Sequence, residues 1–555
     1  MNRTHLYLIF IVLYNIILTD NLSACTNILV TKNASIDGST MIAHTADNHN
    51  LYGELYYIPA KDYPVGSMLD IYDRDSGEYL GQIPQVQHTY SVIGYMNEFQ
   101  VTIGETTFTG REELRDTTGI LDYKNLIFIA LQRSKSAREA IKTMTSLVQK
   151  YGYYSTGESF SIADPNEVWI MEMIGKGPGN KGANWVARLI PDGMVCAHAN
   201  QSRITTFPLN DPDICIYSKD IIEFAEYKGY FSGNKKEFSF SDAFAPLDYG
   251  ALRFCEARVW SAFLKMNNNM DEYQNYAMGK SVERMPLFIK PNNKVSTRDI
   301  MAIMRDHFEG TPLDMTEDVG AGPYKVPYRF RPLTWYVDSV QYFNERAIAT
   351  QQTAFTFVSQ MRNWLDNPIG GVLWFGVDDA NTTVYVPMYC GITQPPPSYA
   401  AGNGDLLTFT WKSAFWVFNW VSNQSYTRYS LMIKDIRKVQ KSLEDKFEQT
   451  QPAIEQTARM LYNQSPDLAR QFLTEYSNMQ AELTMNKYRD LGQFLFVKYL
   501  DGNLHEEKDG KFLRNPSGKP SECKHPGYDQ HFYEQIVKDT GDKLKMKKIG
   551  ETEHH

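Results

Sequence analysis

Hydrophobic and polar positions alternate in two short segments near the start of the chain, residues 26–32 (TNILVTK) and 39–45 (STMIAHT). Alternation with period two is typical of a half-buried strand, and the intervening Asp37-Gly38 pair favours a hairpin turn. We therefore expect two antiparallel strands. The second strand returns toward the start of the first and brings the residues near His44 to Asp47 beside Cys25. A thiol, an imidazole and a carboxylate would then converge from one hairpin.

Later segments alternate between strand and helix patterns. Strand patterns occupy residues 90–96, 99–105, 159–163, 167–174, 185–190, 195–199, 354–358, 372–377 and 383–387. A period of 3.6 residues predicts helices at 123–131, 137–148 and 296–308, and from 429 to about 500 with a break near 465–466. Strands, inserted helices and further strands indicate an α+β fold, which two stacked antiparallel sheets covered by helices would satisfy.

The apolar run Leu6–Leu18 follows Arg3 and is too short to span a bilayer, as is typical of a secretory signal. Cleavage after Ala24 would make Cys25 the first residue of the mature chain. Its α-amine, with a pKa of about 7.7–8.0, could take the proton of its own thiol. Leu22-Ser23-Ala24-Cys25 also fits lipoprotein processing, which would acylate Cys25 and remove both groups. The apolar strand that follows immediately argues against a flexible lipoprotein tether. A buried strand cysteine without function is the third alternative.

Composition narrows the function further. The chain has 555 residues, a formal net charge of −9 and 22% charged residues, as in an ordinary globular protein, and no basic patch predicts nucleic-acid binding. No second stretch is long and apolar enough to span a membrane. The other cysteines are not spaced as ligands of a metal site; they are Cys196, Cys215, Cys255, Cys390 and Cys523. The sequence leaves open whether any two of them form a disulfide. We expect neither a metal nor an organic cofactor.

Several motifs occur together and in order. They are Cys25-Thr26-Asn27, Ala34-Ser35-x-Asp37-Gly38-Ser39-Thr40, Ala46-Asp47, Asn97-Glu98-x-Gln100-Val101-x-Ile103-Gly104-Glu105-Thr106, Gly157-Glu158-Ser159-Phe160, Glu167-Val168-Trp169-Ile170-Met171-Glu172 and Ala197-His198-Ala199-Asn200-Gln201-x-Arg203-Ile204. This order resembles the secreted bacterial dipeptidases of the PepD/dipeptidase A type, relatives of secernins among the N-terminal-nucleophile hydrolases. The resemblance is strongest over residues 25–204 and continues weakly to about residue 500.

The resemblance implies a four-layer αββα sandwich and specific catalytic roles. Cys25 matches the nucleophile, with its α-amine as the general base. Asp47 matches the carboxylate that holds this amine, and Asn200 matches the amide that lines the oxyanion pocket.

Other residues are candidates for substrate binding. A free substrate amine needs an acidic partner, for which Glu105, Glu158 and Glu172 are candidates without a basis for choosing. Arg203 is also a candidate, although a structural ion pair suits it better. His44 stands where many relatives carry an arginine, and it could lower the pKa of a thiol only while protonated.

We therefore expect a signal peptide at 1–24, a hydrolase domain at 25–428, helices packed on the same domain at 429–500 and a loosely ordered polar tail at 501–555. The expected function is that of an exported dipeptidase, periplasmic or extracellular, with dipeptides as its substrates. The sequence leaves open whether the protein forms a homo-oligomer. The alternatives are an acylase of the same fold, acting on a bile-salt or penicillin-type amide, and a lipid-anchored protein without catalytic activity that is modified at Cys25.

Overall fold

The first two strands form the predicted hairpin. The computed structural model describes residues 25–74 and 76–546, so the expected signal peptide lies outside the described residues. Strands β1 (Thr26–Val30) and β2 (Thr40–Asp47) are buried throughout and pair antiparallel, with Thr26 opposite Thr45. Gly38 has a φ of +82° in the connecting loop, a conformation that a glycine adopts at little cost. The register therefore places the end of β2 beside Cys25.

This hairpin belongs to a seven-stranded antiparallel sheet. Its order is β16 (Phe288–Ile289), β14 (Val195–His198), β1, β2, β19 (Thr353–Met361), β20 (Val372–Val377) and β21 (Val386–Tyr389). β21 begins later than the expected 383–387 strand because the amides of Thr382 and Thr383 both donate to the carbonyl of Asp379 in a turn. The other strand predictions in this sheet are confirmed.

The second sheet has eight strands. Its order is β15 (Cys215–Tyr217), β13 (Ala183–Leu189), β12 (Val168–Gly175), β11 (Gly157–Ala163), β10 (Thr102–Phe108), β9 (Met96–Asn97), β8 (Val92–Ile93) and β3 (Tyr57–Ile58). The expected long strands at 90–96 and 99–105 are wrong in their bounds. A turn at Gly94 (φ +54°) separates β8 from β9, and the Asn97 side chain accepts hydrogen bonds from the amides of Phe99 and Val101.

The two sheets pack against each other through the polar centre of the molecule. β1 and β2 contact β10 and β11. The His198 ring nitrogens lie 2.7 Å from Thr106 Oγ1 and 2.7 Å from Ser161 Oγ, so hydroxyl groups satisfy the buried ring from both sides. This is where the site described below lies, since Cys25 and Glu105 come from facing sheets.

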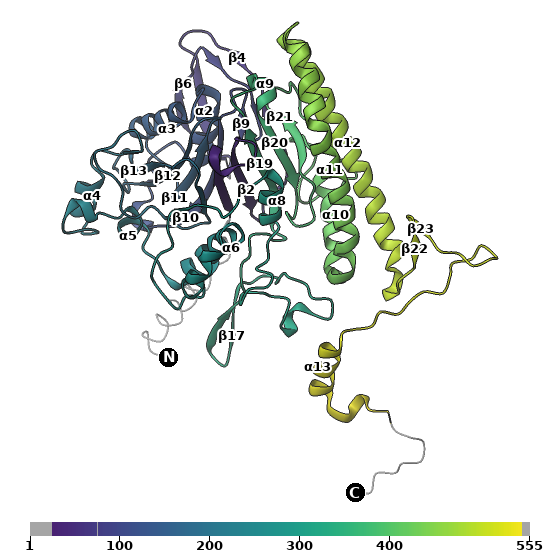
Figure 1. The fold of residues 1–555 in the computed structure, drawn as a ribbon. Coiled ribbons are helices and arrows are strands. Elements are labelled where there is room, and N and C mark those ends of the chain that lie inside the picture. Colours follow the sequence, from purple (N-terminus) through teal and green to yellow (C-terminus); the bar gives the residue numbers. More distant parts are fainter. Residues whose placement is uncertain (1–24, 75, 547–555) are drawn as a thin grey trace.

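Helices cover the sheets on their other sides (Figure 1). The helices are α2 (Tyr123–Arg133), α3 (Ala137–Tyr151), α4 (Ile221–Tyr227), α5 (Phe240–Phe244), α6 (Ala257–Met266), α7 (Gln274–Ala277), α8 (Thr297–Ile303), α9 (Asn367–Gly370), α10 (Ala414–Thr427), α11 (Tyr429–Tyr462), α12 (Pro466–Lys498) and α13 (Gln530–Thr540). α2 and α3 contact the eight-stranded sheet, and α6, α8, α10 and α12 contact the seven-stranded sheet. The fold is α+β, as expected.

The C-terminal helices form the expected hairpin. α11 and α12 pack together, and the chain breaks between Tyr462 and Pro466. Sequence analysis missed α10, whose apolar residues do not gather in a stripe, because it is covered on several sides by α11, α12 and β20. Within the described residues, no helix combines the length and the apolar character needed to cross a bilayer.

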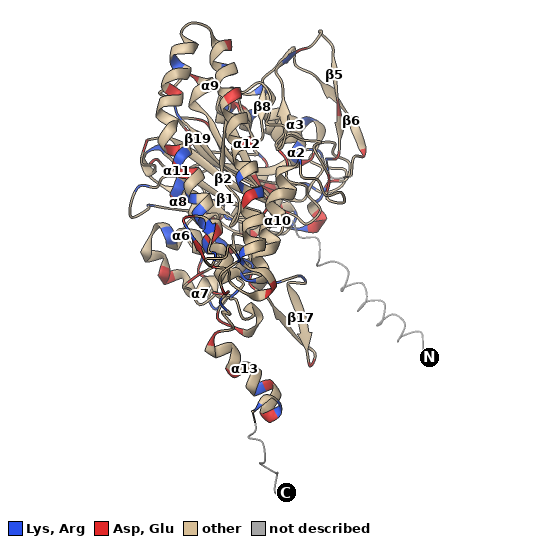
Figure 2. Ribbon diagram, turned by 90° about the vertical axis from the view of Figure 1, so that its right-hand side faces the viewer, with Lys and Arg blue, Asp and Glu red and all other residues tan. Residues whose placement is uncertain are grey.

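Four two-stranded ribbons and the C-terminal segment extend from this body. The ribbons pair β4 (Lys61–Asp62) with β7 (His88–Thr89), β5 (Met68–Tyr72) with β6 (Tyr79–Pro84), β17 (Thr334–Val337) with β18 (Val340–Phe343), and β22 (Glu507–Lys508) with β23 (Lys511–Phe512). Beyond α12 the chain is largely exposed and carries α13 away from the sheets (Figure 2). All six cysteines are free thiols.

Candidate active site

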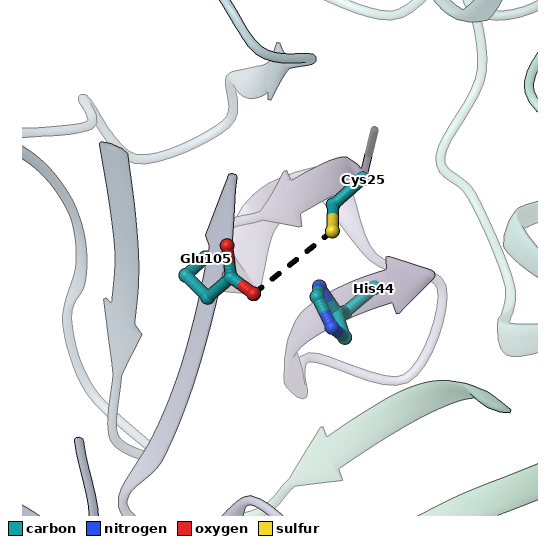
Figure 3. A group of neighbouring side chains, drawn as sticks. All are labelled: Cys25, His44 and Glu105. Atoms are coloured by element: carbon teal, nitrogen blue, oxygen red, sulfur yellow. Dashed lines mark hydrogen bonds between the residues drawn. The ribbon is translucent and has the colours of Figure 1, made fainter. Parts of the chain in front are cut away.

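Cys25 directly precedes β1, and its thiol faces acidic groups. Its Sγ donates to Oε1 of Glu105 on β10 across 3.9 Å (Figure 3). Burial raises the pKa of the thiol well above its usual value, and the Glu105 and Asp47 carboxylates raise it further, while a hydrogen bond from the Asp47 backbone opposes them. The thiol is therefore protonated at neutral pH and becomes a nucleophile only when a base takes its proton.

His44 lies beside Cys25 but carries no charge. Its ring contacts the aromatic rings of Tyr95, Phe355 and Phe357, and burial lowers its pKa to about 3. Its Nδ1 lies 2.8 Å from the side-chain amide of Asn27, which donates to it when the amide oxygen faces Ser161. A neutral imidazole cannot replace the charge of an arginine, so His44 does not activate the thiol electrostatically at neutral pH.

Glu105 and Glu158 form a coupled carboxylate pair on neighbouring strands. Glu158 is fully buried on β11 and accepts a hydrogen bond of 3.0 Å from Thr107 Oγ1. Burial raises the pKa of Glu158 well above its usual value, and the charge of Glu105 and a hydrogen bond to it raise it further. Glu158 therefore keeps its proton to a higher pH than an exposed glutamate does, because a second carboxylate lies beside it.

Asp47 ends β2 in a buried ion pair. Its Oδ2 lies 2.5 Å from Nη2 of Arg346 and accepts from Thr45 Oγ1 at 3.0 Å, and its Oδ1 accepts from Thr353 Oγ1 at 2.6 Å. Thr45 Oγ1 in turn accepts from the backbone amide of Thr26 at 3.1 Å. This network fixes the Asp47 carboxylate against the first residues of β1.

Arg258 joins Cys25 to Asn200, and sequence analysis missed it. This fully buried arginine on α6 donates from Nη1 to the Cys25 carbonyl (2.6 Å) and to Thr26 Oγ1 (2.8 Å), and from Nη2 to Asn200 Oδ1 (2.9 Å). Burial lowers its pKa to about 10. A π-helical turn, Ala251–Glu256, leads directly into α6, a feature frequently found near functional sites. An arginine in an otherwise apolar helical segment is the only signal that the sequence offered.

Asn200 adopts an unusual backbone conformation directly after β14. Its φ is +59°, in the left-handed region that asparagine tolerates better than most residues. Its Nδ2 donates to the carbonyl of Thr107 at 2.6 Å, while its Oδ1 faces Arg258. These two bonds fix the orientation of the amide, with its N–H groups on the side of the eight-stranded sheet.

Glu172 and Arg203 lie in a different network. Arg203 forms a buried ion pair with Glu256, with Nε 3.0 Å from Oε1. Glu172 accepts from the backbone amide of Arg203 and from the hydroxyl of Ser202, each at 2.5 Å, and burial raises its pKa to about 7. Their described contacts hold the loop after Asn200 in place, and neither residue belongs to the cluster of Cys25, His44 and Glu105.

A cavity opens next to Asp47. It is small, with a volume of about 20 Å³, and its lining includes the arginines Arg329, Arg331 and Arg346 together with His49 and Glu345. The pKa of His49 is lowered, mainly by burial and further by the charges of Arg331 and Arg346. The cavity therefore has a positive potential that can attract an anionic group close to Asp47.

The chain is similar to a peptidase family and to several known proteins. A model of peptidase family C69 matches residues 24–54 and 52–442. A protein of Latilactobacillus sakei named "Probable dipeptidase" is 25% identical over 509 residues, covering 87% of this chain and 99% of the relative. "Dipeptidase A" of Lactobacillus helveticus is 25% identical over 77% of this chain and 85% of its own length. "Dipeptidase" of Bifidobacterium longum is 27% identical over 344 residues, covering 55% of this chain and 63% of the relative.

Proposed function

The chain belongs to peptidase family C69, a family of cysteine-type peptidases, and we propose that it hydrolyses the peptide bond of dipeptides with Cys25 as the nucleophile. One observation carries this proposal. The Cys25 thiol stands at the entry to β1, between the Glu105 carboxylate and the backbone of Asp47. The three relatives named above support the choice of dipeptides, since each has a dipeptidase name.

Cleavage after Ala24 supplies the base that the thiol needs. It would release the α-amine of Cys25, and the apolar run Leu6–Leu18 supports such processing during export. Asp47 is the residue that we assign to hold this amine, because its carboxylate is fixed against the first residues of β1 through Thr45. A carboxylate at that position favours the protonated amine that forms when the thiol is deprotonated.

The reaction then follows from the positions of the groups. The amine takes the proton of the thiol, and Sγ attacks the carbonyl carbon of the substrate. The tetrahedral intermediate collapses when the amine returns the proton to the leaving nitrogen, which leaves a thioester on Cys25. Water hydrolyses the thioester by the same proton transfers in reverse.

The negative oxygen of the intermediate needs a hydrogen-bond donor. We assign Asn200 to this role, because Arg258 links its side chain to the carbonyl of Cys25. Arg258 fixes both groups with one rigid guanidinium, so their relative positions are set before substrate binds. We assign Arg258 as the positioning residue of the site.

The two ends of a dipeptide carry opposite charges, and the surroundings of Cys25 match both. The Glu105–Glu158 pair suits the α-ammonium group, since the carboxylate of Glu105 lies 3.9 Å from the nucleophile. We assign the terminal carboxylate to the arginines beside Asp47, of which Arg331 lines the small cavity there. This complementarity favours a dipeptidase over an acylase, whose substrates have no free amine.

We extend the proposal to the layers of the fold and to the location of the protein. We assign the two packed sheets and their helices to a four-layer αββα sandwich formed by residues 25–428. The helical hairpin at 429–500 would be an addition to this domain, followed by the tail 501–555. Export with a free, unacylated Cys25 completes the proposal.

A pair of variants tests the function. Cys25→Ala should abolish dipeptide hydrolysis and keep the native circular-dichroism spectrum and melting temperature. Cys523→Ser, which changes another free thiol far along the chain in the C-terminal segment, should retain activity. Full activity in Cys25→Ala would overturn the proposal. A panel of dipeptides, N-acetyl dipeptides and acylated amino acids separates the dipeptidase from an acylase.

A further inference from the structure

Cys25, His44 and Glu105 bring three different metal-binding groups together (Figure 3). One ligand atom from each residue, a thiol sulfur, an imidazole nitrogen and a carboxylate oxygen, lies within 4.8 Å of the other two. All three side chains are buried. They come from the approach to β1, from β2 and from β10, so the packing of the two sheets defines the cluster.

We propose that these residues bind one thiophilic divalent cation, with Zn²⁺ as the preferred ion, and that the bound ion blocks the nucleophile. This metal site lies beyond the peptidase reaction, which needs no metal ion in the mechanism above. Binding itself does not depend on the proposed function. Only the inhibitory consequence does.

The chemistry of the donors favours zinc. Zn²⁺ binds cysteine sulfur at about 2.3 Å, histidine nitrogen at about 2.0–2.1 Å and carboxylate oxygen at about 2.0–2.2 Å, usually in tetrahedral geometry. Ligand atoms of such a site are about 3.5 Å apart, given those bond lengths. Donors within 4.8 Å of one another need to approach by about 1 Å, which side-chain rotation can supply. Calcium and magnesium prefer sites built from oxygen ligands alone.

His44 supports the site independently. Its Nε2 is buried and has no hydrogen-bond partner among the described residues. An unsatisfied buried nitrogen costs free energy that a metal bond would offset. When Nε2 binds the ion, Nδ1 keeps the ring proton, and Oδ1 of Asn27 at 2.8 Å can accept it once the amide turns its oxygen toward the ring, as the partners of metal-binding histidines commonly do.

The processed N-terminus would add a fourth donor. The α-amine and the thiolate of one cysteine form a five-membered chelate ring with a metal ion. With His44 and Glu105 they complete a set of two nitrogens, one sulfur and one oxygen. Before processing, a water molecule would take the fourth position. Binding breaks the S–H bond, forms an S–Zn bond and releases the proton to solvent, with no change of oxidation state.

The bound ion uses the groups that the reaction uses. It removes the Cys25 thiolate and its amine, and it neutralises the carboxylate that we assign to the substrate ammonium. Zn²⁺ should therefore inhibit dipeptide hydrolysis in competition with substrate, and excess EDTA should restore activity. This consequence rests on the proposed function.

Cobalt provides a direct test, because Co²⁺ occupies zinc sites and a thiolate ligand adds strong near-ultraviolet absorption. We would titrate the full processed chain with Co²⁺ and then with Zn²⁺, using a reductant that contains no thiol. The proposal predicts one Co²⁺ per chain, a thiolate band and displacement by Zn²⁺. Cys25→Ala should lose the band, and His44→Phe and Glu105→Gln should each weaken binding by about tenfold or more.

A matched control excludes the tail. Cys523 and His525 are two residues apart in the exposed C-terminal segment and could bind the ion instead, so Cys523→Ser must leave the band unchanged. Absence of a thiolate band, or a band lost in Cys523→Ser and retained in Cys25→Ala, overturns the proposal.

Alkylation provides a second readout in the unchanged protein: Zn²⁺ should protect Cys25 from iodoacetamide, and equal labelling with and without Zn²⁺ contradicts the site. Neither readout needs substrate, so an inactive enzyme does not affect them.

Discussion

The Sγ atom of Cys25 lies 3.9 Å from Oε1 of Glu105, although the two residues are 80 positions apart and belong to facing sheets. A carboxylate at this distance makes a thiolate harder to form, because like charges repel. Its presence next to a nucleophile therefore needs another reason. Recognition of a cationic group on the substrate is the reason that we propose.

The first prediction concerns this recognition. Glu105→Gln removes the charge and keeps the size of the side chain, so kcat/KM for a dipeptide should fall about 10- to 100-fold, as expected for a lost hydrogen bond to a charged group. Cleavage of the N-acetyl dipeptide, slow in the native enzyme, should change much less. Exposed Glu237 offers a control, and Glu237→Gln should behave as the native protein. Equal losses on both substrates would argue against ammonium recognition.

The second prediction concerns the contribution of two buried histidines to stability in mild acid. Burial lowers the pKa values of His44 and His198 to about 3, so the unfolded chain binds more protons than the folded one between about pH 3 and pH 6.5. These two histidines should therefore lower the free energy of unfolding as pH decreases below about 6.5, by up to about 1.4 kcal/mol per pH unit for each, whereas Glu172, whose pKa burial raises to about 7, acts in the opposite direction between about pH 7 and pH 4.5.

Denaturant unfolding between pH 7 and pH 4 measures this slope. His198→Gln should reduce the slope of the unfolding free energy with pH by the contribution of one histidine, whereas His531→Gln, at an exposed position, should leave the slope unchanged. An unchanged slope in His198→Gln would show that the buried histidine is not the source.

The third prediction concerns Arg258. Lysine keeps the positive charge and loses the fork that bonds Cys25, Thr26 and Asn200 together, so Arg258→Lys should lower kcat about 100-fold, with a smaller change in KM. Arg253→Lys, one helical turn earlier and also buried, should lower the melting temperature and spare kcat. If both variants lose activity only in proportion to their unfolded fraction, Arg258 has a structural role alone.

The fourth prediction separates the two roles of Asn200. Removal of an oxyanion donor typically costs about 100- to 1,000-fold in kcat, so Asn200→Gly and Asn200→Ala should both be nearly inactive. Their stabilities should differ, because φ is +59° and alanine pays about 1 kcal/mol or more for this conformation whereas glycine does not. Kinetics and unfolding midpoints measure the two effects. An active Asn200→Gly variant would remove Asn200 from the reaction.

Local patterns allowed much of the fold to be predicted. The Asp37-Gly38 turn and the alternating strands beside it predicted the hairpin that brings His44 to Cys25, because hairpin register depends on neighbouring residues. The helix at 137–148 was predicted from its period of 3.6 residues, and the Ser136 side chain at its start accepts from the amide of Glu139 as an N-cap should. These features need no knowledge of distant contacts.

The remaining features depend on contacts between distant segments. The bonds from Arg258 reach the Cys25 carbonyl across 233 positions, and a carbonyl acceptor leaves no trace in the sequence. Likewise, three glutamates were equivalent candidates for the substrate amine until the packed sheets placed Glu105 beside the thiol and placed Glu172 against the loop that holds Arg203. For the same reason, the sequence did not show whether His44 is charged, since the aromatic residues that surround its ring come from other strands.

The central claim is that the thiol and the α-amine of Cys25 act together, and the intact mass and N-terminal sequence of the active protein, purified from its own host, test it most directly. The account predicts a chain that begins at Cys25 with no added mass, so that both groups are free. A chain acylated at Cys25, or an active chain that retains residues before it, would contradict the account and leave the thiol without its proposed base.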